Sequence, residues 1–311
     1  MDKAIIILPA YADHSLERQA MAELGLRVEE IDLRKGRAEA RAALGEARIV
    51  FVRDTVLDAD LINAMTRCVG IVRYGIGIDN IDVAAANARG ITVARVPDYG
   101  AEIEVADHAV ALFLAVRRRI VSRDAQVRKG AWQVGQTEPI YRIAGSTAGF
   151  IGFGRIARAV ADRLRAFGVT QAVVYDPYLD PATLPEWARR ADDLNELAEQ
   201  SDIVSLHAPA TPENRHLINA DFLSRMRPTA VLINTARGQL VDEQALANAL
   251  EKGTIFGAGI DVFSVEPPVG SPLLRAPNVV LSDHNGWYSE TTVRNIQSGA
   301  VEQARKILLN A

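Results

Sequence analysis

The sequence has little cysteine and no long apolar run. Its one cysteine, Cys68, excludes a disulfide within the chain. Cys68 precedes the apolar run Val69–Val72, which predicts a buried thiol rather than a nucleophile. No stretch of about 18 apolar residues occurs, so a membrane-spanning helix is not expected. The apolar run Ala4–Leu8 is short and typical of a strand rather than a signal peptide, and we expect a cytoplasmic protein.

An excess of charge of either sign is also absent. The 35 basic and 39 acidic residues give a formal net charge of −4, which favours neither a nucleic acid nor a membrane as partner. The densest basic run, Arg117–Arg119, ends an apolar helical pattern, so it predicts a solvated helix C-terminus. His14 lies in a polar segment and is also expected to be solvated. No metal-ligand cluster is visible, and we expect no metal.

Short β-branched runs alternate with helical patterns along most of the chain. Continuous apolar runs of this kind are typical of parallel strands covered on both faces, so the predicted fold class is α/β with doubly wound sheets. The predicted strands are Ile5–Leu8, Arg48–Val52, Val69–Arg73, Ile91–Val93, Ala148–Ile151, Ala172–Tyr175, Ile203–Leu206, Ala230–Asn234, Ile255–Ile260 and Val279–Leu281.

The pattern breaks twice, near Pro97–Gly100 and near Asp283–Tyr288. These positions predict hinges between two domains, with a last helix over Ser289–Leu308 beyond the second. A long helix follows the first hinge, and its expected apolar stripe comprises Ile103, Ala106, Val110, Phe113 and Val116.

A dinucleotide-binding fingerprint follows the strand at 148–151. Gly152, Gly154 and Ala157 form the pattern G-x-G-x-x-A at the start of a helix. There the helix N-terminus offers free N–H groups to a pyrophosphate. Asp176 ends the next strand, 24 residues after Gly152, where an acid accepts hydrogen bonds from a ribose and repels a 2′-phosphate. The sequence therefore predicts NAD rather than NADP.

A second glycine pair, Gly75 and Gly77, also follows a strand. Asn80 occupies the place of the third small residue, so we do not expect a nucleotide there. The residues alone leave open a plain turn or a small anion nest made of backbone N–H groups.

Polar side chains follow several predicted strands at the edge where α/β proteins bind ligands. His207 and His284 are the histidines placed there, and both are candidates for acid–base work. Arg237 and Glu266 also follow strands. An arginine there could clamp a carboxylate or lie on the surface, and spacing alone does not decide.

Across nearly its whole length the chain resembles the D-isomer-specific 2-hydroxyacid dehydrogenases. The stretches that carry the resemblance are Arg73–Asp82, Glu104–His108, Gly149–Ala157, Ser205–Pro209, Asn234–Gly238 and Gly259–Pro267. The family implies two Rossmann-like domains with the active site in the cleft between them. It implies a discontinuous substrate-binding domain over residues 1–98 and 287–311 and an NAD-binding domain over 99–286.

The resemblance also implies roles for individual residues. Arg237 would hold the substrate carboxylate and polarise its carbonyl, His284 would be the acid–base, and Glu266 would hydrogen-bond His284. The implied substrate-binding residues are Arg53, Tyr74, Gly75, Ile76, Gly77, Arg237 and Trp287. The implied cofactor-binding residues are Gly152, Gly154, Arg155, Ile156, Asp176, His207, Ala208, Pro209, Thr235, Ala236 and Asp261.

The chain departs from the family around its histidine. The family usually has proline before it and alanine two residues after it, where this chain has Asp283 and Gly286. The run Trp287–Glu290 is most similar to the C-terminal-binding protein branch, and the phosphoglycerate dehydrogenases are the other similar branch.

The implied activity is hydride transfer between NAD(H) and a small D-2-hydroxy or 2-keto acid, and a homodimer is expected through the long helix. The alternatives are a D-3-phosphoglycerate dehydrogenase and an NAD-binding corepressor or redox sensor.

Overall fold

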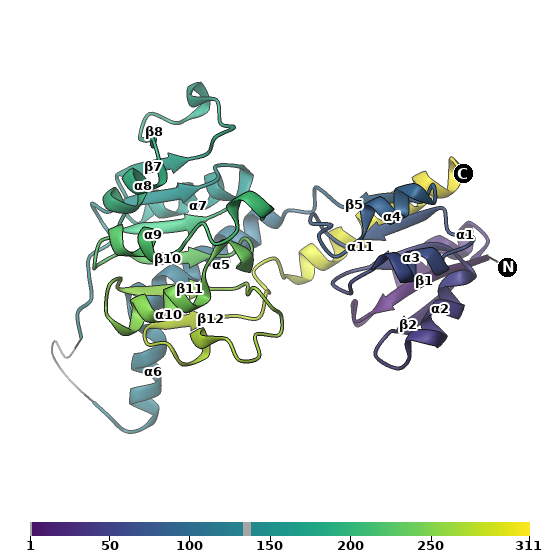
Figure 1. The fold of residues 1–311 in the computed structure, drawn as a ribbon, viewed down its shortest axis with the longest axis horizontal. Helices are drawn as coiled ribbons and strands as arrows, with labels where there is room; N and C mark the ends of the chain where they lie inside the picture. Colours follow the sequence, from purple (N-terminus) through teal and green to yellow (C-terminus); the bar gives the residue numbers. More distant parts are fainter. Residues whose placement is uncertain (1, 133–137) are drawn as a thin grey trace. The chain divides into compact units, whose positions relative to one another are not determined.

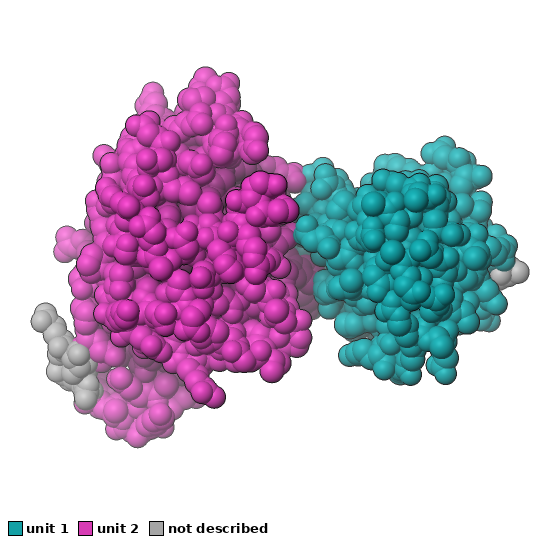
Figure 2. Space-filling view, viewed as in Figure 1, with its two compact units in different colours: residues 1–100, 289–311 teal, residues 101–288 magenta. Residues whose placement is uncertain are grey.

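The computed structural model describes residues 2–132 and 138–311, and the chain divides into two compact units (Figures 1 and 2). Unit 1 comprises Met1–Gly100 and Ser289–Ala311, and unit 2 comprises Ala101–Tyr288. The chain therefore leaves unit 1 after Gly100 and returns to it at Ser289. The sequence predicted these two boundaries after residues 98 and 286.

Unit 1 is built on a parallel sheet of five strands in the order β2-β1-β3-β4-β5. This is the flavodoxin-like order of doubly wound sheets. The strands are β1 (Asp2–Leu8), β2 (Leu26–Asp32), β3 (Ala47–Val52), β4 (Gly70–Arg73) and β5 (Thr92–Arg95).

Helices cover both faces of this sheet (Figure 1). On one face, a core cluster joins side chains of α2, α3 and α4 to alternate strand residues such as Val50 and Val52. On the other, α1 packs against α11, which also contacts β3, β4 and β5. The helices are α1 (Ser15–Glu23), α2 (Arg37–Gly45), α3 (Ala59–Ala64), α4 (Val83–Ala88) and α11 (Glu290–Leu309).

Unit 2 holds a parallel sheet of seven strands in the order β12-β11-β10-β9-β6-β7-β8. The strand order reverses between β6 and β9, as in a Rossmann fold, and ligands bind at such a reversal. The strands are β6 (Thr147–Ile151), β7 (Gln171–Tyr175), β8 (Ala188–Arg190), β9 (Ile203–Leu206), β10 (Val231–Asn234), β11 (Gly257–Ile260) and β12 (Val279–Leu281).

The two faces of this sheet are also both covered. Phe150 points into a cluster with α5 and α7, whereas its neighbour Ile151 points into a cluster with α8, α9 and α10. The helices are α5 (Ala101–Arg117), α6 (Ile120–Arg128), α7 (Arg155–Ala166), α8 (Leu194–Gln200), α9 (Ala220–Arg225) and α10 (Glu243–Glu251), with 3₁₀ turns at Pro181–Thr183, Pro212–Asn214, Gly238–Leu240 and Pro272–Arg275.

Side-chain caps fix where several helices begin. In unit 2, Asp193, Asn219 and Asp242 each accept a hydrogen bond from the backbone N–H three residues later. In unit 1, Ser289 and Thr292 form a reciprocal capping box at the start of α11. Such caps satisfy N–H groups that the first helical turn leaves without partners.

The α/β fold class with two parallel sheets is confirmed, and so is the burial of Cys68. Burial raises the pKa of the Cys68 thiol to about 11, which keeps it protonated. Within the described residues, no helix has the length and apolar character needed to cross a bilayer.

Three expectations from the sequence were wrong. His14 is 4% exposed rather than solvated, because its ring is held between the Tyr11 N–H and the Glu30 carboxylate. Arg117 is 2% exposed and donates to the Thr229 carbonyl, so the basic run is not wholly a solvated helix end. Ile103 is exposed, so the buried stripe of α5 starts later.

Candidate active site

The glycine turn at residues 152–154 lies at the reversal of strand order in unit 2. Gly152 follows β6 with φ of 81°, and its N–H donates to the Tyr175 carbonyl (2.9 Å). A Cβ on Gly152 would lie 2.9 Å from the backbone of His207 and Ala208, which follow β9. The turn can therefore lie against the neighbouring strand end only because residue 152 has no side chain.

Asp176 closes this turn from the end of β7. Its Oδ2 accepts the Phe153 N–H and its Oδ1 accepts the Tyr178 N–H, both at 3.0 Å. The acid thus shapes the glycine turn while its carboxylate stays partly exposed. The carboxylate oxygens of Asp176 have further lone pairs, which can accept hydrogen bonds from the hydroxyls of a ribose.

These features fit a dinucleotide. No heavy atom lies within 4 Å of a Cβ built on Gly154, so the backbone at the N-terminus of α7 is open to a phosphate. The Thr235 hydroxyl is buried without a hydrogen-bond partner among the described residues. The other predicted cofactor contacts lie on the first turn of α7 (Arg155, Ile156), after β9 (His207, Ala208, Pro209) and after β10 (Thr235, Ala236).

His207 is unsuited to act as the acid. Burial lowers its pKa to about 3, and its Nε2 lies 2.8 Å from the Ser205 hydroxyl. The ring is therefore neutral near pH 7. Of the two histidines that position alone had singled out, His284 is the one suited to carry a proton.

His284 and Glu266 form a hydrogen-bonded pair. The Nδ1 of His284 lies 2.8 Å from Oε2 of Glu266. A carboxylate only accepts hydrogen bonds, so Nδ1 carries hydrogen and Nε2 is the atom that gains and loses a proton. The hydrogen bond to Glu266 raises the pKa of His284, although burial opposes the rise.

A second hydrogen bond orients the Glu266 carboxylate for its contact with His284. Its second oxygen, Oε1, accepts the Phe263 N–H at 2.9 Å. Burial alone would raise the pKa of Glu266, but the hydrogen bonds from His284 and Phe263 lower it. Glu266 is therefore a charged partner for the imidazolium.

Asp261 organises the turn that carries His284. Its backbone carbonyl accepts the His284 N–H (2.8 Å), and its carboxylate accepts the N–H groups of Asn285 (3.1 Å) and Gly286 (3.0 Å). Burial would raise the pKa of Asp261, yet hydrogen bonds from His108, Ser282 and Gly286 lower it. These contacts hold His284 in the left-handed region, with φ of 56°, which is uncommon outside glycine.

His108 and Ser282 belong to this network, and sequence reasoning missed both. Nε2 of His108 lies 2.8 Å from the Ser282 hydroxyl and 3.3 Å from Asp261 Oδ1, and the Ser282 hydroxyl donates to Asp261 (2.7 Å). The network also explains Gly286, because a Cβ there would lie 2.9 Å from Asp261 Oδ2 and 3.2 Å from the His108 ring.

A pocket of about 610 Å³ lies beside the pair. Prolines and leucines make up much of its wall, so it is mainly apolar near the titrating ring. Its lining residues are Phe263, Glu266, Pro267, Pro268, Leu274, Leu281, Ser282, Asp283 and His284.

Arg237 follows β10, and its backbone is fixed by the Asn234 side chain. Asn234 donates to the Arg237 carbonyl (2.9 Å) and accepts the Ala236 N–H (3.0 Å). The Arg237 charge lowers the pKa of His284, which opposes the effect of Glu266. Arg237 is therefore close enough to act on the titrating ring electrostatically.

Trp287 is tied to the same turn. Its Nε1 donates to the His284 carbonyl (3.0 Å), and its ring packs edge-to-face on Tyr288. It is not among the residues that line the pocket. These contacts give it a part in holding the turn.

The remaining predicted residues lie in unit 1, at the carboxyl ends of its strands. Among the described residues, no acceptor takes the N–H groups of Ile76 and Gly77, which follow Gly75. Arg53 follows β3, donates to the Ala10 carbonyl and pairs with Asp54. The Tyr74 side chain is buried, so its contribution to this loop is positional rather than a direct side-chain contact.

Comparison with known proteins gives consistent matches. Residues 110–286 match the family model of the D-isomer specific 2-hydroxyacid dehydrogenase, NAD binding domain. The chain is 42% identical over 240 residues to a glyoxylate reductase of Korarchaeum cryptofilum, covering 76% of this chain and 72% of that protein. It is 40% identical over 246 residues to a D-3-phosphoglycerate dehydrogenase of Mycobacterium tuberculosis (strain ATCC 25618 / H37Rv), covering 79% and 46%. It spans about half the length of the phosphoglycerate dehydrogenases it matches.

Solved structures agree over the whole chain. The TT0316 protein from Thermus thermophilus superposes with a TM-score of 0.88 at 36% identity, covering 99% of this chain and 97% of that one. A D-lactate dehydrogenase from Aquifex aeolicus, complexed with NAD and lactic acid, has a TM-score of 0.88 at 27% identity, covering 99% and 96%.

Proposed function

Because this chain belongs to the D-isomer-specific 2-hydroxyacid dehydrogenase family, we propose that it reduces small 2-keto acids with NADH and oxidises the matching D-2-hydroxy acids with NAD. The observation that carries the proposal is the Glu266–His284 pair beside a pocket, in the unit that holds the dinucleotide turn. The family resemblance seen in the sequence motifs is confirmed by these matches.

The pair supplies the proton chemistry. Reduction of a ketone creates an alkoxide, and Nε2 of protonated His284 donates the proton that neutralises it. Glu266 stabilises the imidazolium through Nδ1 and fixes the ring. In oxidation the neutral ring accepts the proton from the hydroxyl.

Other residues bind and orient the substrate. The planar guanidinium of Arg237 suits a bidentate contact with the α-carboxylate and polarises the adjacent carbonyl. The N–H groups at 76 and 77 are suited to an anion, which assigns them to the carboxylate as well. Arg53 adds positive charge near that loop.

NAD would be held by the glycine turn, Asp176 and the strand ends after β9 and β10, and it supplies or accepts the hydride. The Asp176 carboxylate favours NAD over NADP because a 2′-phosphate there would meet a negative charge. Asp261 is among the residues that the family resemblance assigns to the cofactor, and its hydrogen bonds within the His284 turn support an orienting role as well.

Assays against a panel of keto acids would identify the substrate. We expect NADH-dependent reduction of glyoxylate or pyruvate by the wild-type protein, since an apolar pocket lies beside His284. Oxidation of D-3-phosphoglycerate is the second candidate, because several of the similar proteins carry that name. Turnover of 3-phosphohydroxypyruvate well above that of glyoxylate and pyruvate would favour it.

We also propose a homodimer in the cytoplasm. The long helix α5 was expected to form the interface, but most of its apolar residues pack against its own unit. Exposed apolar side chains gather instead on and after α6, at Ile120, Val121, Val127 and Trp132. A second copy of this chain is the partner that the homodimer proposal assigns to them.

A further inference from the structure

Tyr74 immediately precedes the proposed carboxylate loop and is fixed at three atoms. Its N–H donates to the Val52 carbonyl (2.8 Å), and its carbonyl accepts from Arg73 Nη1 (2.6 Å). Its hydroxyl donates to Oε1 of Glu17 (2.8 Å). The loop at 75–77 therefore starts from a residue with little freedom to move.

The phenol is enclosed by aromatic rings. The Tyr74 side chain is 1% exposed, stacked on Phe51 (5.7 Å between centroids) and edge-to-face with Tyr11 (5.1 Å). Burial and the Glu17 charge raise the pKa of Tyr74 well above its usual value. The hydroxyl therefore stays protonated and remains a donor.

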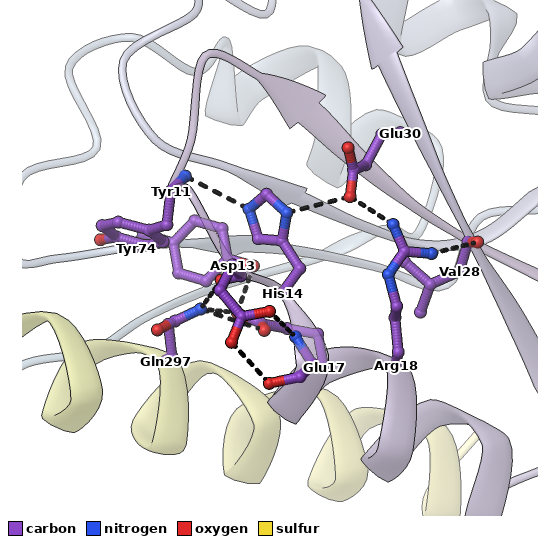
Figure 3. Close-up of polar contacts among 10 residues, drawn as sticks. Tyr11, Asp13, His14, Glu17, Arg18, Val28, Glu30, Tyr74 and Gln297 are labelled. Atoms are coloured by element: carbon purple, nitrogen blue, oxygen red, sulfur yellow. Dashed lines mark hydrogen bonds and ion pairs between the residues drawn. The ribbon is translucent and has the colours of Figure 1, made fainter.

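Glu17 links this phenol to the C-terminal helix. It lies on α1, is 0% exposed, and accepts from Gln297 Nε2 of α11 at 3.1 and 3.2 Å (Figure 3). The same Nε2 donates to the Asp13 carbonyl (2.8 Å). One carboxylate thus joins the residue before the loop to the helix by which the chain returns to unit 1.

A carboxylate in this position is costly. Among the described residues, the contacts of Glu17 are hydrogen bonds from the neutral Tyr74 and Gln297, and no cation pairs with it. The neighbouring cation Arg18 pairs with Glu30 instead, and Glu30 also contacts His14 (Figure 3). A buried carboxylate without a cationic partner is a poor choice for stability alone.

We propose that Glu17 is a positioning residue for substrate binding: through Tyr74 it fixes the loop whose N–H groups at 76 and 77 receive the substrate carboxylate. The inference rests on the proposed function. The Glu17 carboxylate touches neither substrate nor cofactor, and it acts by holding the loop in one conformation before the substrate arrives. Preorganisation of this kind improves substrate affinity without changing the chemical step.

The test compares Tyr74→Phe and Glu17→Gln with a control. Tyr74→Phe removes one hydroxyl and leaves the aromatic packing, whereas Glu17→Gln removes the charge. Ile62→Val is the matched control, since Ile62 of α3 is buried in a separate core cluster of the same unit. For each variant we would measure the melting temperature, the NADH dissociation constant, KM and kcat for glyoxylate, and hydrogen exchange of residues 74–80.

Tyr74→Phe should raise KM about tenfold, the effect of one lost hydrogen bond to a charged group, with kcat and NADH binding unchanged. Glu17→Gln should raise KM in the same direction. The KM of the double variant should be no higher than that of the more severe single variant, because both changes break the same connection between Glu17 and the loop. Amide exchange in residues 74–80 should be faster in both variants and unchanged in Ile62→Val.

The inference is overturned if both variants, like a control that loses only packing, have a lower melting temperature while KM and exchange in the loop stay at wild-type values. It is also overturned if exchange rises but KM does not, or if the two effects on KM simply add. A wild-type protein inactive with every keto acid would contradict the proposed function instead. The exchange measurement would still show whether Glu17 holds the loop.

Discussion

The chemistry proposed for this protein depends on the protonation state of His284, which its contact with Glu266 controls. Glu266 sits 2.8 Å from Nδ1 of His284 and raises the histidine pKa, while Arg237 lowers it. The protonated form is needed for reduction and the neutral form for oxidation. With rising pH, the rate of reduction should therefore fall through the His284 pKa while the rate of oxidation rises.

Glu266→Gln should move both pH profiles to lower pH. Glutamine keeps a hydrogen bond to Nδ1 but removes the charge that stabilises the imidazolium, so the His284 pKa drops. A shift of one pH unit corresponds to about 1.4 kcal/mol of lost interaction. The measurement is kcat/KM against pH in both directions.

Asp283 is the complication in this experiment, because it could supply a substitute charge next to His284. Asp283→Asn in the Glu266→Gln background removes that charge as well. Profiles that stay in place in both variants would show that His284 is not the titrating acid.

Asp176 gives a second prediction at the residue scale. Its carboxylate both bonds the glycine turn and faces the proposed ribose site, so alanine would disturb two functions at once. Asp176→Asn retains an acceptor for one turn N–H and removes the charge. It should weaken discrimination against NADPH, by about 1 kcal/mol or more. Equal use of NADH and NADPH by the wild-type protein would refute the assignment.

At the scale of elements, strands with a continuous apolar run were predictable and those without one were not. The strand before the fingerprint was predicted at 148–151 and is observed at Thr147–Ile151. β2 and β8 were not predicted. In β2, LRVEEID, charged residues separate the apolar ones, and the three-residue β8, ARR, has no apolar pattern. Both are edge strands with many exposed or half-exposed side chains, so fewer of their positions require an apolar residue.

The residues of the candidate site also divide into those that the sequence could predict and those that it could not. Arg237 and Glu266 could be named because each follows a strand inside a stretch that resembles the family. His284 could be named because it follows a strand at the ligand-binding edge of the sheet and matches the family's histidine. The contacts of His108 could not be predicted, although it ends one of the stretches that resemble the family, because it lies on α5, remote in sequence from Asp261 and Ser282. The contact depends on how α5 packs against the sheet, and helical periodicity records burial but not the partner of a single polar group.

Substitutions of Arg117 test how the packing of α5 contributes to stability. Its guanidinium lies about equally far from the rings of Phe113, Tyr141 and Phe256, 5.7–6.0 Å from each centroid, and burial lowers its pKa. Arg117→Ala should destabilise the protein by about 2–4 kcal/mol, because it removes both the buried stem and the hydrogen bond to Thr229.

Arg117→Met is the matched control, since it keeps the stem and relieves the desolvation of the charge. Its loss in the free energy of unfolding should be less than half that of alanine in urea titrations. Equal losses would show that the charge itself stabilises this site.

For the whole molecule, the chain path explains why unit 1 is discontinuous. α11 begins just after the return point, behind the capping box of Ser289 and Thr292, and covers a face of the sheet formed by the first hundred residues. The N-terminal part therefore has the β3–β5 region of one sheet face covered only after the C-terminal helix is made.

The homodimer is a prediction at this scale. Val127→Glu places a charge among the exposed apolar residues of α6 and should convert the dimer to a monomer, because an unpaired charge in an apolar interface is costly. Sedimentation velocity at micromolar concentration measures this. A wild-type protein that sediments as a monomer would refute the proposal.

The central claim is that NADH-dependent reduction of a 2-keto acid uses His284 as its acid. It is tested most directly by measuring NADH consumption with glyoxylate, pyruvate and 3-phosphohydroxypyruvate, for wild type and His284→Ala, with NADH binding measured in parallel. The account predicts turnover of at least one keto acid by the wild-type protein, and a loss in His284→Ala of about 10²–10⁴-fold in kcat with NADH binding retained. Undiminished turnover by His284→Ala, or no turnover of any keto acid by the wild-type protein, would contradict it.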